Sequence, residues 1–561
     1  MRCRLADRPS APRAPDAETE YRGRRWALIF GLVVMGLTSI PYILGFAMQN
    51  PGWVFTGFVF GVEDGNSYIA KMLTGAAGEW LFRTPYSIYP QNGVLAFPFY
   101  IWLGKLGFAP GLHEQLVVLY HLFRICAGVL AIVATYDFVA IFVKGYRNRQ
   151  LATALSILGG GLGWVLLLLG EANFLGSYPL EFYSPETFGF LSIYGLPHLA
   201  LARATLLWGI KFYLQSPESD AASSTRSGIK VGLLWLTTSL AQPLTGLVMG
   251  YVVALHLCLS YLKLLWLRLR KRRIDNNLTI PYLKTASIAA CFALPYLLYN
   301  AYAFSTDPFL QSWTDQNIIQ SPHPLHYIFA YGWMLPLALP GAVDIIRKYP
   351  WQGWLPVGWF FSFPLLAYLP VNLQRRLVEG VWTALVVLAI VGLEWAAERR
   401  TKPIPRQIIW LYFAPIFMSS LLLLSGGVRS ALTPREPLFR PNLEISAFQY
   451  LSEVVEDNDV VLAAYTTGNP LPAWAPVHMI IGHGPESVGL KELSGQITKF
   501  YSQYTADTFR QEYISEHGVD YVFWGPNERQ LGSWEPFSND FLERIYSAGG
   551  YEIYLTRQDM Q

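Results

Sequence analysis

Long apolar runs recur along almost the whole chain and constrain its fold more than any other feature. The first extends from Trp26 to Met48, about 23 residues, which is long enough to cross roughly 30 Å of hydrocarbon as a helix. Because backbone groups in a bilayer must be hydrogen-bonded within their own segment, such runs predict helices. Ten more runs follow, so we predict a polytopic α-helical membrane protein of about 11 spans, the later ones at 115–143, 151–170, 188–213, 229–243, 245–266, 282–303, 325–346, 352–371, 377–396 and 407–426.

The composition agrees with this prediction and excludes other classes of protein. Charged residues make up 14% of the 561 residues, whereas soluble domains carry about 25%. This balance excludes a disordered chain, a coiled coil and an ordinary cytosolic enzyme. The four cysteines show neither the spacing of a zinc site nor that of a disulfide framework. No cofactor is predicted, and the sequence leaves a requirement for a divalent metal open.

The basic clusters predict the orientation in the membrane. Residues 1–25 contain seven arginines and four acidic residues, which predicts a cytoplasmic arm. The short run 94–109 can be a span or an interfacial helix. Only the interfacial choice places the later basic clusters on the cytoplasmic side, at 144–149, 268–273, 347–348 and 399–406. An odd number of spans then places the C-terminus outside, and we expect a location in the plasma (inner) membrane.

Three parts follow from these patterns: the arm 1–25, a transmembrane domain at 26–427 with an outer first loop at 49–114, and an extracytoplasmic domain at 428–561. From Arg429 onward the chain has nine basic and 18 acidic residues, so this tail is acidic while the rest is basic. Its pattern predicts a soluble α/β domain with buried strands at 459–465, 478–482 and 519–524, an edge strand at 551–556, and helices at 444–456, 486–503, 507–517 and 538–547.

Two adjacent carboxylates, Glu63 and Asp64, follow the first span and precede a predicted short helix. An Asp near a helix N-terminus is held as the anion, and a carboxylate at the membrane surface can accept a proton from a hydroxyl. The simpler interpretation is that Asp64 only caps the helix. Both interpretations are open at this point.

The order of motifs here resembles the first loop of the GT-C glycosyltransferases, in particular the branch of the protein O-mannosyltransferases and the lipid A aminoarabinose transferases. The resemblance covers about 80 residues and consists of an acidic pair, a tyrosine, a Gly-x-Trp turn, an aromatic interfacial run and a span bearing an arginine. In this chain these are Glu63-Asp64, Tyr68, Gly78-Glu79-Trp80, the run 94–109, and Arg124.

The resemblance implies an inverting transfer of a sugar from a polyprenyl-phosphate donor to an acceptor hydroxyl at the outer face, with Asp64 or Glu63 as the base. The partners it implies are the lipid bilayer, the lipid-linked sugar and an acceptor that is a protein, a lipid or a polysaccharide. Relatives with a lysine before the interfacial helix use it on the donor phosphate. The segment 89–93 has no such cation, so that role is either empty here or filled by a residue from elsewhere in the chain.

Four basic residues are candidates for the donor phosphate. Arg375 and Arg376 lie at the predicted outer end of a span, against the usual charge bias, and arginine suits bidentate phosphate contact. The alternative is that they reach toward lipid headgroups. Arg124 and His198 lie inside predicted spans, where ionisable residues are costly. Arg124 is a candidate for a functional or a structural polar contact, and so is His198.

Tyr68, Lys71 and Asp315 are the candidates for substrate binding, and Tyr68 and Lys71 are expected on the acceptor side. Asp315 belongs to an outer loop at 304–324, whose aromatic and acidic residues can bind sugar or simply lie at the membrane interface. His478, His483 and Glu486 of the tail have the residue types of a metal site, but we expect them to be ordinary polar residues of the tail.

Two rival functions are compatible with the same composition. A transporter or flippase of lipid-linked glycans should show paired, broken spans in its two halves, and no such duplication is visible. A non-catalytic envelope assembly protein would depend on its tail and tolerate changes at Asp64.

Overall fold

The computed structural model describes residues 17–216, 221–270, 279–456 and 458–557. Residues 1–16 of the basic arm and 271–273 of one basic cluster lie outside this part. The chain divides into two compact units. The helical unit comprises Met1–Thr38, Phe123–Tyr299 and Ile319–Ser425, and the loop–tail unit comprises Ser39–Leu122, Asn300–Ile318 and Gly426–Gln561. The first loop and the tail therefore fold together.

Within the described residues, seven helical segments are long and apolar enough to cross a membrane. They are built from α1 (Ala17–Ala47), α4 (Leu112–Phe142), α10 (Pro243–Leu269), α11 (Ile280–Thr306), α13 to α14 (Leu325–Tyr331 and Leu335–Lys348), η5 to α16 (Gln374–Val378 and Val381–Glu398) and α17 to α18 (Arg406–Phe413 and Met418–Ala431). These helices indicate a multi-pass membrane protein, and the count of eleven spans stays a prediction.

The other predicted runs are shorter or interrupted helices. They form α5 (Tyr146–Leu158), α6 (Trp164–Leu168), α7 (Phe190–Gly195), α8 (Pro197–Leu214), α9 (Ala221–Ala241) and α15 (Trp354–Ala367), and the short η1 (Leu180–Phe182) lies between the runs 151–170 and 188–213. The prediction of one continuous helix over 151–170 is wrong. Its glycine-rich centre leaves the helical path and bonds to other segments, with Gly160 N donating to Ile416 O at 2.8 Å and Leu162 N to Phe329 O at 2.9 Å. Gly161 lies so close to Ala330 that an added Cβ would be 2.5 Å from its Cα.

Close backbone contact also organises the centre of the helical unit. Helix α16 is buried along its membrane-spanning window and packs against α14 and α15. A Cβ on Gly341 would lie 1.9 Å from Leu388 O, and one on Gly392 would lie 1.8 Å from Leu337 O. Small residues let apolar helices approach this closely, and dispersion contacts then hold them together.

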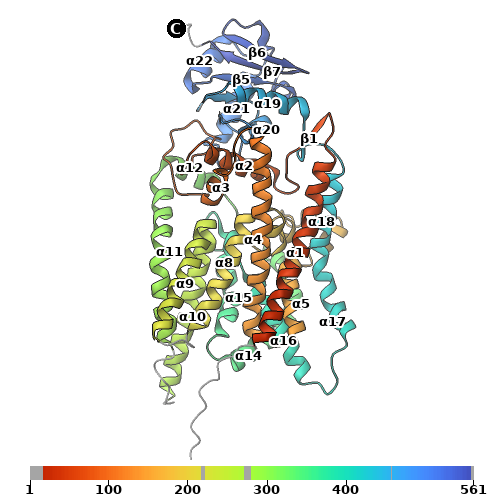
Figure 1. Cartoon of the computed structure of the whole chain (residues 1–561), viewed down its shortest axis with the longest axis vertical. Helices are drawn as coiled ribbons and strands as arrows, with labels where there is room; N and C mark the ends of the chain where they lie inside the picture. The colour runs from red at the N-terminus through yellow and green to blue at the C-terminus, as the bar shows by residue number, and fades with distance from the viewer. Residues whose placement is uncertain (1–16, 217–220, 271–278, 457, 558–561) are drawn as a thin grey trace, which may run out of the picture. The chain divides into compact units, whose positions relative to one another are not determined.

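The tail contains a five-stranded sheet with the strand order β4-β3-β5-β7-β6. Its strands β5, β6 and β7 are labelled in Figure 1. The strands are β3 (Val460–Leu462), β4 (His478–Met479), β5 (Tyr521–Trp524), β6 (Leu542–Ala548) and β7 (Tyr551–Thr556). Strands β3, β4 and β5 are parallel, and β7 and β6 join them antiparallel. The predicted helices at 444–456, 486–503 and 507–517 correspond to α19 (Asn442–Val454), α21 (Leu490–Phe500) and α22 (Asp507–His517).

The prediction of a helix at 538–547 is wrong, because this segment contains most of the edge strand β6. The consequence is that β7, predicted as the edge, is an inner strand between β5 and β6. Gly549 and Gly550 join β6 to β7 with φ values of 56° and 86°. Glycine adopts such angles without a Cβ penalty, so a Gly-Gly pair between two runs is a hairpin signal.

The first loop contributes β1 (Trp53–Phe55), α2 (Val62–Ala76) and α3 (Pro98–Gly104). Strand β1 pairs antiparallel with β2 (Phe439–Pro441) at the start of the tail. Helix α3 has seven residues, far fewer than the roughly 20 that cross a bilayer, which agrees with the interfacial choice for the run 94–109. A further short helix, α12 (Pro308–Gln316), belongs to the same unit.

Helices α2 and α3 touch through glycine, which gives a first testable expectation. A Cβ on Gly104 would lie 1.8 Å from Met72 O, and one on Gly75 would lie 2.0 Å from Ile101 O. Because these are backbone atoms, a substitution must separate the two helices. We expect Gly104→Ala to destabilise the loop–tail unit by about 1–3 kcal/mol in thermal unfolding. Gly495→Ala in α21, where an added Cβ meets nothing within 4 Å, is the control and should not destabilise. Equal effects would contradict the packing argument.

Candidate functional site

Glu63 and Asp64 both lie in the first turn of α2, and both side chains are exposed. The helix is preceded by Gly61, whose φ of 59° is left-handed and favours glycine. Because Gly61 is the N-cap and no side chain caps the helix, the interpretation of Asp64 as a cap is wrong. The Asp64 side chain is 55% exposed, so this carboxylate lies near a helix N-terminus and is also accessible at the protein surface.

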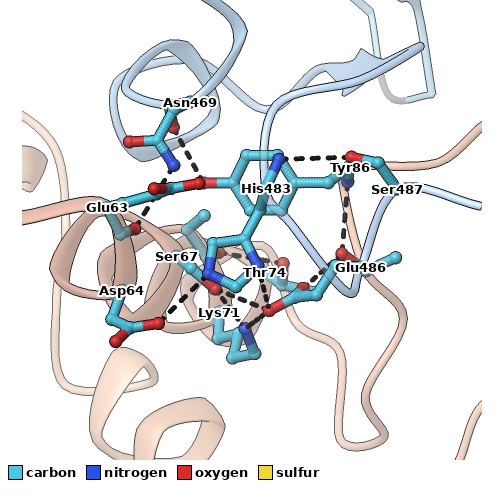
Figure 2. A network of polar contacts seen from close by, with 12 residues as sticks. Glu63, Asp64, Ser67, Lys71, Thr74, Tyr86, Asn469, His483, Glu486 and Ser487 are labelled. Atoms are coloured by element: carbon cyan, nitrogen blue, oxygen red, sulfur yellow. Dashed lines mark hydrogen bonds and ion pairs between the residues drawn. The ribbon is translucent and has the colours of Figure 1, made fainter. Parts of the chain in front are cut away.

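A loop of the tail places His483 against Asp64 (Figure 2). The Nε2 atom of His483 lies 3.3 Å from Asp64 Oδ1, and its Nδ1 atom lies 3.3 Å from Glu486 Oε1. The imidazole is almost buried, with its side chain 10% exposed. It therefore connects an exposed carboxylate to a buried one.

Lys71 follows Asp64 on α2 and binds the buried carboxylate of this cluster, which is that of Glu486. Its Nζ atom lies 2.6 Å from Glu486 Oε1, and the two side chains are 1% and 2% exposed. Ser67 Oγ donates to Glu486 Oε1 at 2.8 Å and also accepts from Lys71 Nζ. Thr84 Oγ1 donates to Glu486 Oε2 at 2.5 Å. Because both Glu486 oxygens are bonded, this buried charge is fully satisfied.

Glu63 is held by a separate set of tail residues (Figure 2). Tyr465 Oη donates to Glu63 Oε1, and Asn469 Nδ2 donates to Glu63 O at 3.3 Å. Asn66 Nδ2 donates to Asn469 Oδ1 at 2.8 Å, and Tyr86 Oη donates to Asn469 O at 2.9 Å. The tail thus engages both acids of the pair, and only Asp64 contacts the histidine in a side-chain hydrogen bond.

The electrostatics of the cluster follow from burial and from these contacts. Burial lowers the pKa of His483, but Glu486 and Asp64 outweigh it and raise that pKa above the usual value. Burial raises the pKa of Glu486, but Lys71 and His483 outweigh it and hold that pKa below the usual value. Partial desolvation raises the pKa of Glu63, against the opposing charge of His483. A protonated His483 would favour the anion of Asp64 beside it.

The raised pKa of His483 predicts a pH-dependent stability. A folded-state pKa above the unfolded value of 6.5 stabilises the fold below pH 6.5, and this contribution is lost as the pH rises through the folded pKa. We expect the Tm difference between the wild type and His483→Gln to be largest below pH 6.5 and to shrink above it. His478→Gln is the matched control. Burial lowers the pKa of His478, so its neutral form is favoured and the trend should reverse. The same trend in both variants would refute the assignment.

The structure places the substrate-binding candidates Tyr68, Lys71 and Asp315 in the same unit but in different surroundings. Tyr68 is buried and stacks on Tyr100, with ring centroids 4.5 Å apart. Lys71 is buried in the ion pair described above and lies over the Phe97 ring at 4.7 Å. Asp315 is exposed on α12. Lys71 is therefore engaged by protein groups, while Asp315 is accessible.

The candidates for the donor phosphate lie in the helical unit. Arg375 and Arg376 belong to η5, where Arg375 stacks over the Tyr183 ring at 4.4 Å and Arg376 pairs with Glu186 at 3.5 Å. The Nε atom of Arg375 is buried, and no hydrogen-bond partner for it occurs among the described residues. Arg124 is buried in α4, and its Nη1 donates to Thr38 Oγ1 at 3.2 Å.

His198 is a further candidate in this unit and is buried near the start of α8. Five residues later on the same helix, Arg203 forms a bidentate pair with the buried Glu379, at 2.5 and 3.0 Å. Arg203 also donates to Phe188 O, Pro185 O and Ser192 Oγ. These contacts occupy Arg203 with protein groups.

The sequence interpretation missed the contribution of His483 and Glu486 to this cluster. The two residues have no local motif, and their partners Asp64 and Lys71 are 419 and 415 positions away. The sequence signal for them is the His483-x-x-Glu486 spacing, which places two ionisable residues three positions apart in a glycine-rich loop. Among the residues that the structure describes, no group of three His, Cys, Asp or Glu side chains is arranged to hold a metal ion.

Comparison with known proteins relates this fold to solved structures. No family model matches the chain, and no curated protein matches its sequence. The apo oligosaccharyltransferase from Archaeoglobus fulgidus matches with a TM-score of 0.54 and 12% identity, over 96% of this chain and 75% of its own. The same archaeal enzyme, AglB, in complex with an inhibitory peptide and a dolichol-phosphate matches with a TM-score of 0.50 and 11% identity, over 94% of this chain and 75% of its own.

A third solved structure is the arabinofuranosyltransferase AftD from Mycobacteria. It matches with a TM-score of 0.54 and 13% identity, over 95% of this chain but only 41% of its own. The matched proteins are GT-C glycosyltransferases, which is the class that the first-loop motifs resemble. At these identities the likeness concerns the fold. The expected GT-C fold is therefore confirmed, and the chain folds as these glycosyltransferases do.

Proposed function

We propose that this protein is an inverting membrane glycosyltransferase that moves a sugar from a polyprenyl-phosphate donor to an acceptor hydroxyl at the outer face of the membrane. The observation that carries the proposal is the exposed Asp64 at the start of α2, with its Oδ1 atom 3.3 Å from the nearly buried His483. An accessible carboxylate next to a polarising histidine is suited to general-base chemistry.

In the proposed reaction, Asp64 accepts the proton of the acceptor hydroxyl. The acceptor oxygen attacks the anomeric carbon of the sugar and forms the new glycosidic bond. The bond from that carbon to the phosphate oxygen breaks, and polyprenyl phosphate leaves with the electron pair, so the configuration at the carbon inverts. His483 orients Asp64 and favours its anion, and Glu63 is the second candidate base.

The leaving phosphate requires cationic groups, and we assign this role to the helical unit. Arg375 and Arg376 are the first candidates, because guanidinium groups bind phosphate oxygens in pairs. The buried Arg375 Nε, for which the described residues supply no acceptor, supports this choice. Arg124 and His198 are further candidates for stabilising the negative charge of the leaving group.

A lipid-linked donor is supported by the fold and by one of its relatives. The archaeal AglB with this fold was solved with a dolichol-phosphate, which is a polyprenyl-type carrier. With the proposed orientation the first loop and the tail face outward, away from the compartment in which nucleotide sugars are made. In the same proposal the arm 1–25 is cytoplasmic and the part 428–561 is extracytoplasmic.

For substrate binding, we propose that Asp315 contacts the substrate directly, because it is exposed. Tyr68 and Lys71 are buried, so on the acceptor side they would act indirectly. Tyr68 supports α2 through its stack on Tyr100, and Lys71 fixes Glu486 and, through it, His483. No cofactor enters this scheme, and a divalent metal is a variable to be tested.

The experiment is a donor screen with the purified protein in lipid nanodiscs. Radiolabelled polyprenyl-phosphate hexoses and pentoses are added one at a time, with and without a divalent metal, and release of polyprenyl phosphate is followed. Release from one donor at catalytic rates would identify the sugar and the enzyme class. Absence of release from every donor by folded protein would contradict the proposal and favour transport or envelope assembly.

A further inference from the structure

The helical unit contains a cavity of about 780 Å³ between four of its helices. Its lining comes from Arg24 of α1, Asp137 of α4, Trp208 and Phe212 of α8, and Lys230 of α9, together with aliphatic side chains of α4 and α9. Helices α8 and α9 lie side by side along this cavity (Figure 1). One part of the lining is therefore charged and the other part is apolar.

The carboxylate in the cavity, Asp137, is saturated by its neighbours. Arg24 donates to its two oxygens at 2.9 and 3.1 Å, and Trp208 Nε1 donates to Oδ2 at 3.0 Å. Behind the lining, the ammonium group of Lys211 lies 3.1 Å from the same Oδ2 atom, with its side chain only 8% exposed. These contacts occupy the hydrogen-bond acceptor sites of the Asp137 carboxylate.

Lys230 is the additional cation, and it is exposed. Its Nζ atom lies 3.2 Å from the centroid of the Phe212 ring, and among the described residues no carboxylate forms an ion pair with it. Arg24 also pairs with the half-exposed Glu20 at 3.2 Å. The cations Arg24, Lys211 and Lys230 thus outnumber the carboxylates Asp137 and Glu20 by one. Lys230 is the cation without an ion pair among the described residues.

The cavity lies where these helices begin or end. Helix α4 ends at Phe142, five residues after Asp137, and α8 ends at Leu214, three residues after Lys211. On α9, Lys230 lies at the start of the predicted apolar run 229–243, and Leu233, one turn further, is 51% exposed. Cationic groups at the end of a span, next to exposed aliphatic surface, match the two parts of a phospholipid.

We propose that this cavity binds an anionic phospholipid, with its phosphate between Lys230 and Arg24 and an acyl chain along the aliphatic wall of α4 and α9. The phosphate supplies the negative charge that Lys230 lacks, and the indole of Trp208 lies at the level of the headgroup, where amphipathic rings are enriched. Basic pockets between membrane helices bind acidic headgroups in this way. The orientation predicted from the basic clusters assigns the lipid to the cytoplasmic leaflet.

The test is native mass spectrometry of the full-length protein released from detergent with added phosphatidylglycerol or phosphatidylcholine. We expect retention of phosphatidylglycerol over phosphatidylcholine. One lysine near a membrane surface contributes about a fivefold effect on binding, so Lys230→Gln should weaken phosphatidylglycerol retention about fivefold. Lys230→Arg should retain it. Lys402→Gln removes an equally exposed lysine of the same unit and is the matched control, with retention unchanged.

Three outcomes would overturn the proposal. Equal retention of the two lipids would show that headgroup charge is not recognised. An equal loss in Lys230→Gln and Lys402→Gln would show a general charge effect on the surface. Displacement of phosphatidylglycerol by millimolar inorganic phosphate would show that the site takes free phosphate and that the aliphatic wall contributes nothing to binding. Since Lys230 is exposed and its replacement leaves Asp137 paired, loss of the fold is not expected in any of these variants.

Discussion

Asp64→Asn is expected to lower the rate of sugar transfer by about 10²- to 10⁴-fold while the protein stays folded. The amide has the shape of the carboxylate, and its oxygen can still accept a hydrogen bond from His483 Nε2, which lies 3.3 Å from Oδ1 in the wild type. The amide cannot take the proton of the acceptor. The loss should therefore appear in the turnover number, measured as release of polyprenyl phosphate with the donor found in the screen.

The matched control for this prediction is Asp540→Asn, an equally conservative change at an exposed aspartate of the same unit. Its activity should equal that of the wild type. Glu63→Gln separates the two candidate bases, because Glu63 is bonded by Tyr465 and its raised pKa makes it the poorer permanent anion. Normal turnover in Asp64→Asn together with a large loss in Glu63→Gln would assign the base to Glu63 instead.

The second large effect is expected in stability. Lys71→Met removes one partner of the buried pair with Glu486 and leaves a carboxylate that is 2% exposed without its cation. Breaking a buried pair in this way costs about 3–5 kcal/mol. Because Glu486 contacts both Lys71 of α2 and His483 of the tail loop, we expect the loss of stability to be largest in these two segments. Hydrogen exchange should show it as faster opening of α2 and of the loop at 481–487.

Two further variants make this stability prediction specific. Glu79→Gln breaks the exposed pair of Glu79 with Arg83, 3.3 Å apart and nearly half exposed on both sides, and should change stability by less than about 1 kcal/mol. The double variant Lys71→Met with Glu486→Met replaces both buried charges by apolar groups and should be more stable than Lys71→Met alone. A double variant that is as unstable as the sum of the single ones would contradict the pairing.

Much of the fold could be predicted because its signals are local. The apolar runs predicted membrane helices, and the distribution of basic clusters favoured an interfacial helix for the run 94–109. The strands predicted at 459–465 and 519–524 contain β3 and β5. The failures have physical causes. At 159–163 backbone groups bond to residues far along the chain, so a hydropathy average cannot detect the break. At 542–548 an exposed edge strand has the mixed pattern of a surface helix.

The candidate site was predictable only on its first-loop side. Glu63 and Asp64 can be recognised in the sequence as an acidic pair after a span. His483 and Glu486 contact Asp64 and Lys71 only when the tail folds against α2. Lys71 was expected at the acceptor surface, yet burial and the ion pair with Glu486 decide what it contacts. Tertiary pairing of this kind leaves no period or motif in a single sequence.

The strand pair between the first loop and the tail has a consequence for biosynthesis. Asp64 is translated early, and its partner His483 follows 419 residues later. A ribosome that adds 5–20 residues per second needs roughly 20 to 80 s for that interval. Until the tail is made, the nascent loop has neither β2 to pair with β1 nor the carboxylate of Glu486 to receive Lys71. A chain arrested before the tail is made would therefore have its earlier helices but an unassembled first loop, so the Asp64–His483 contact would form only after the tail has been synthesised.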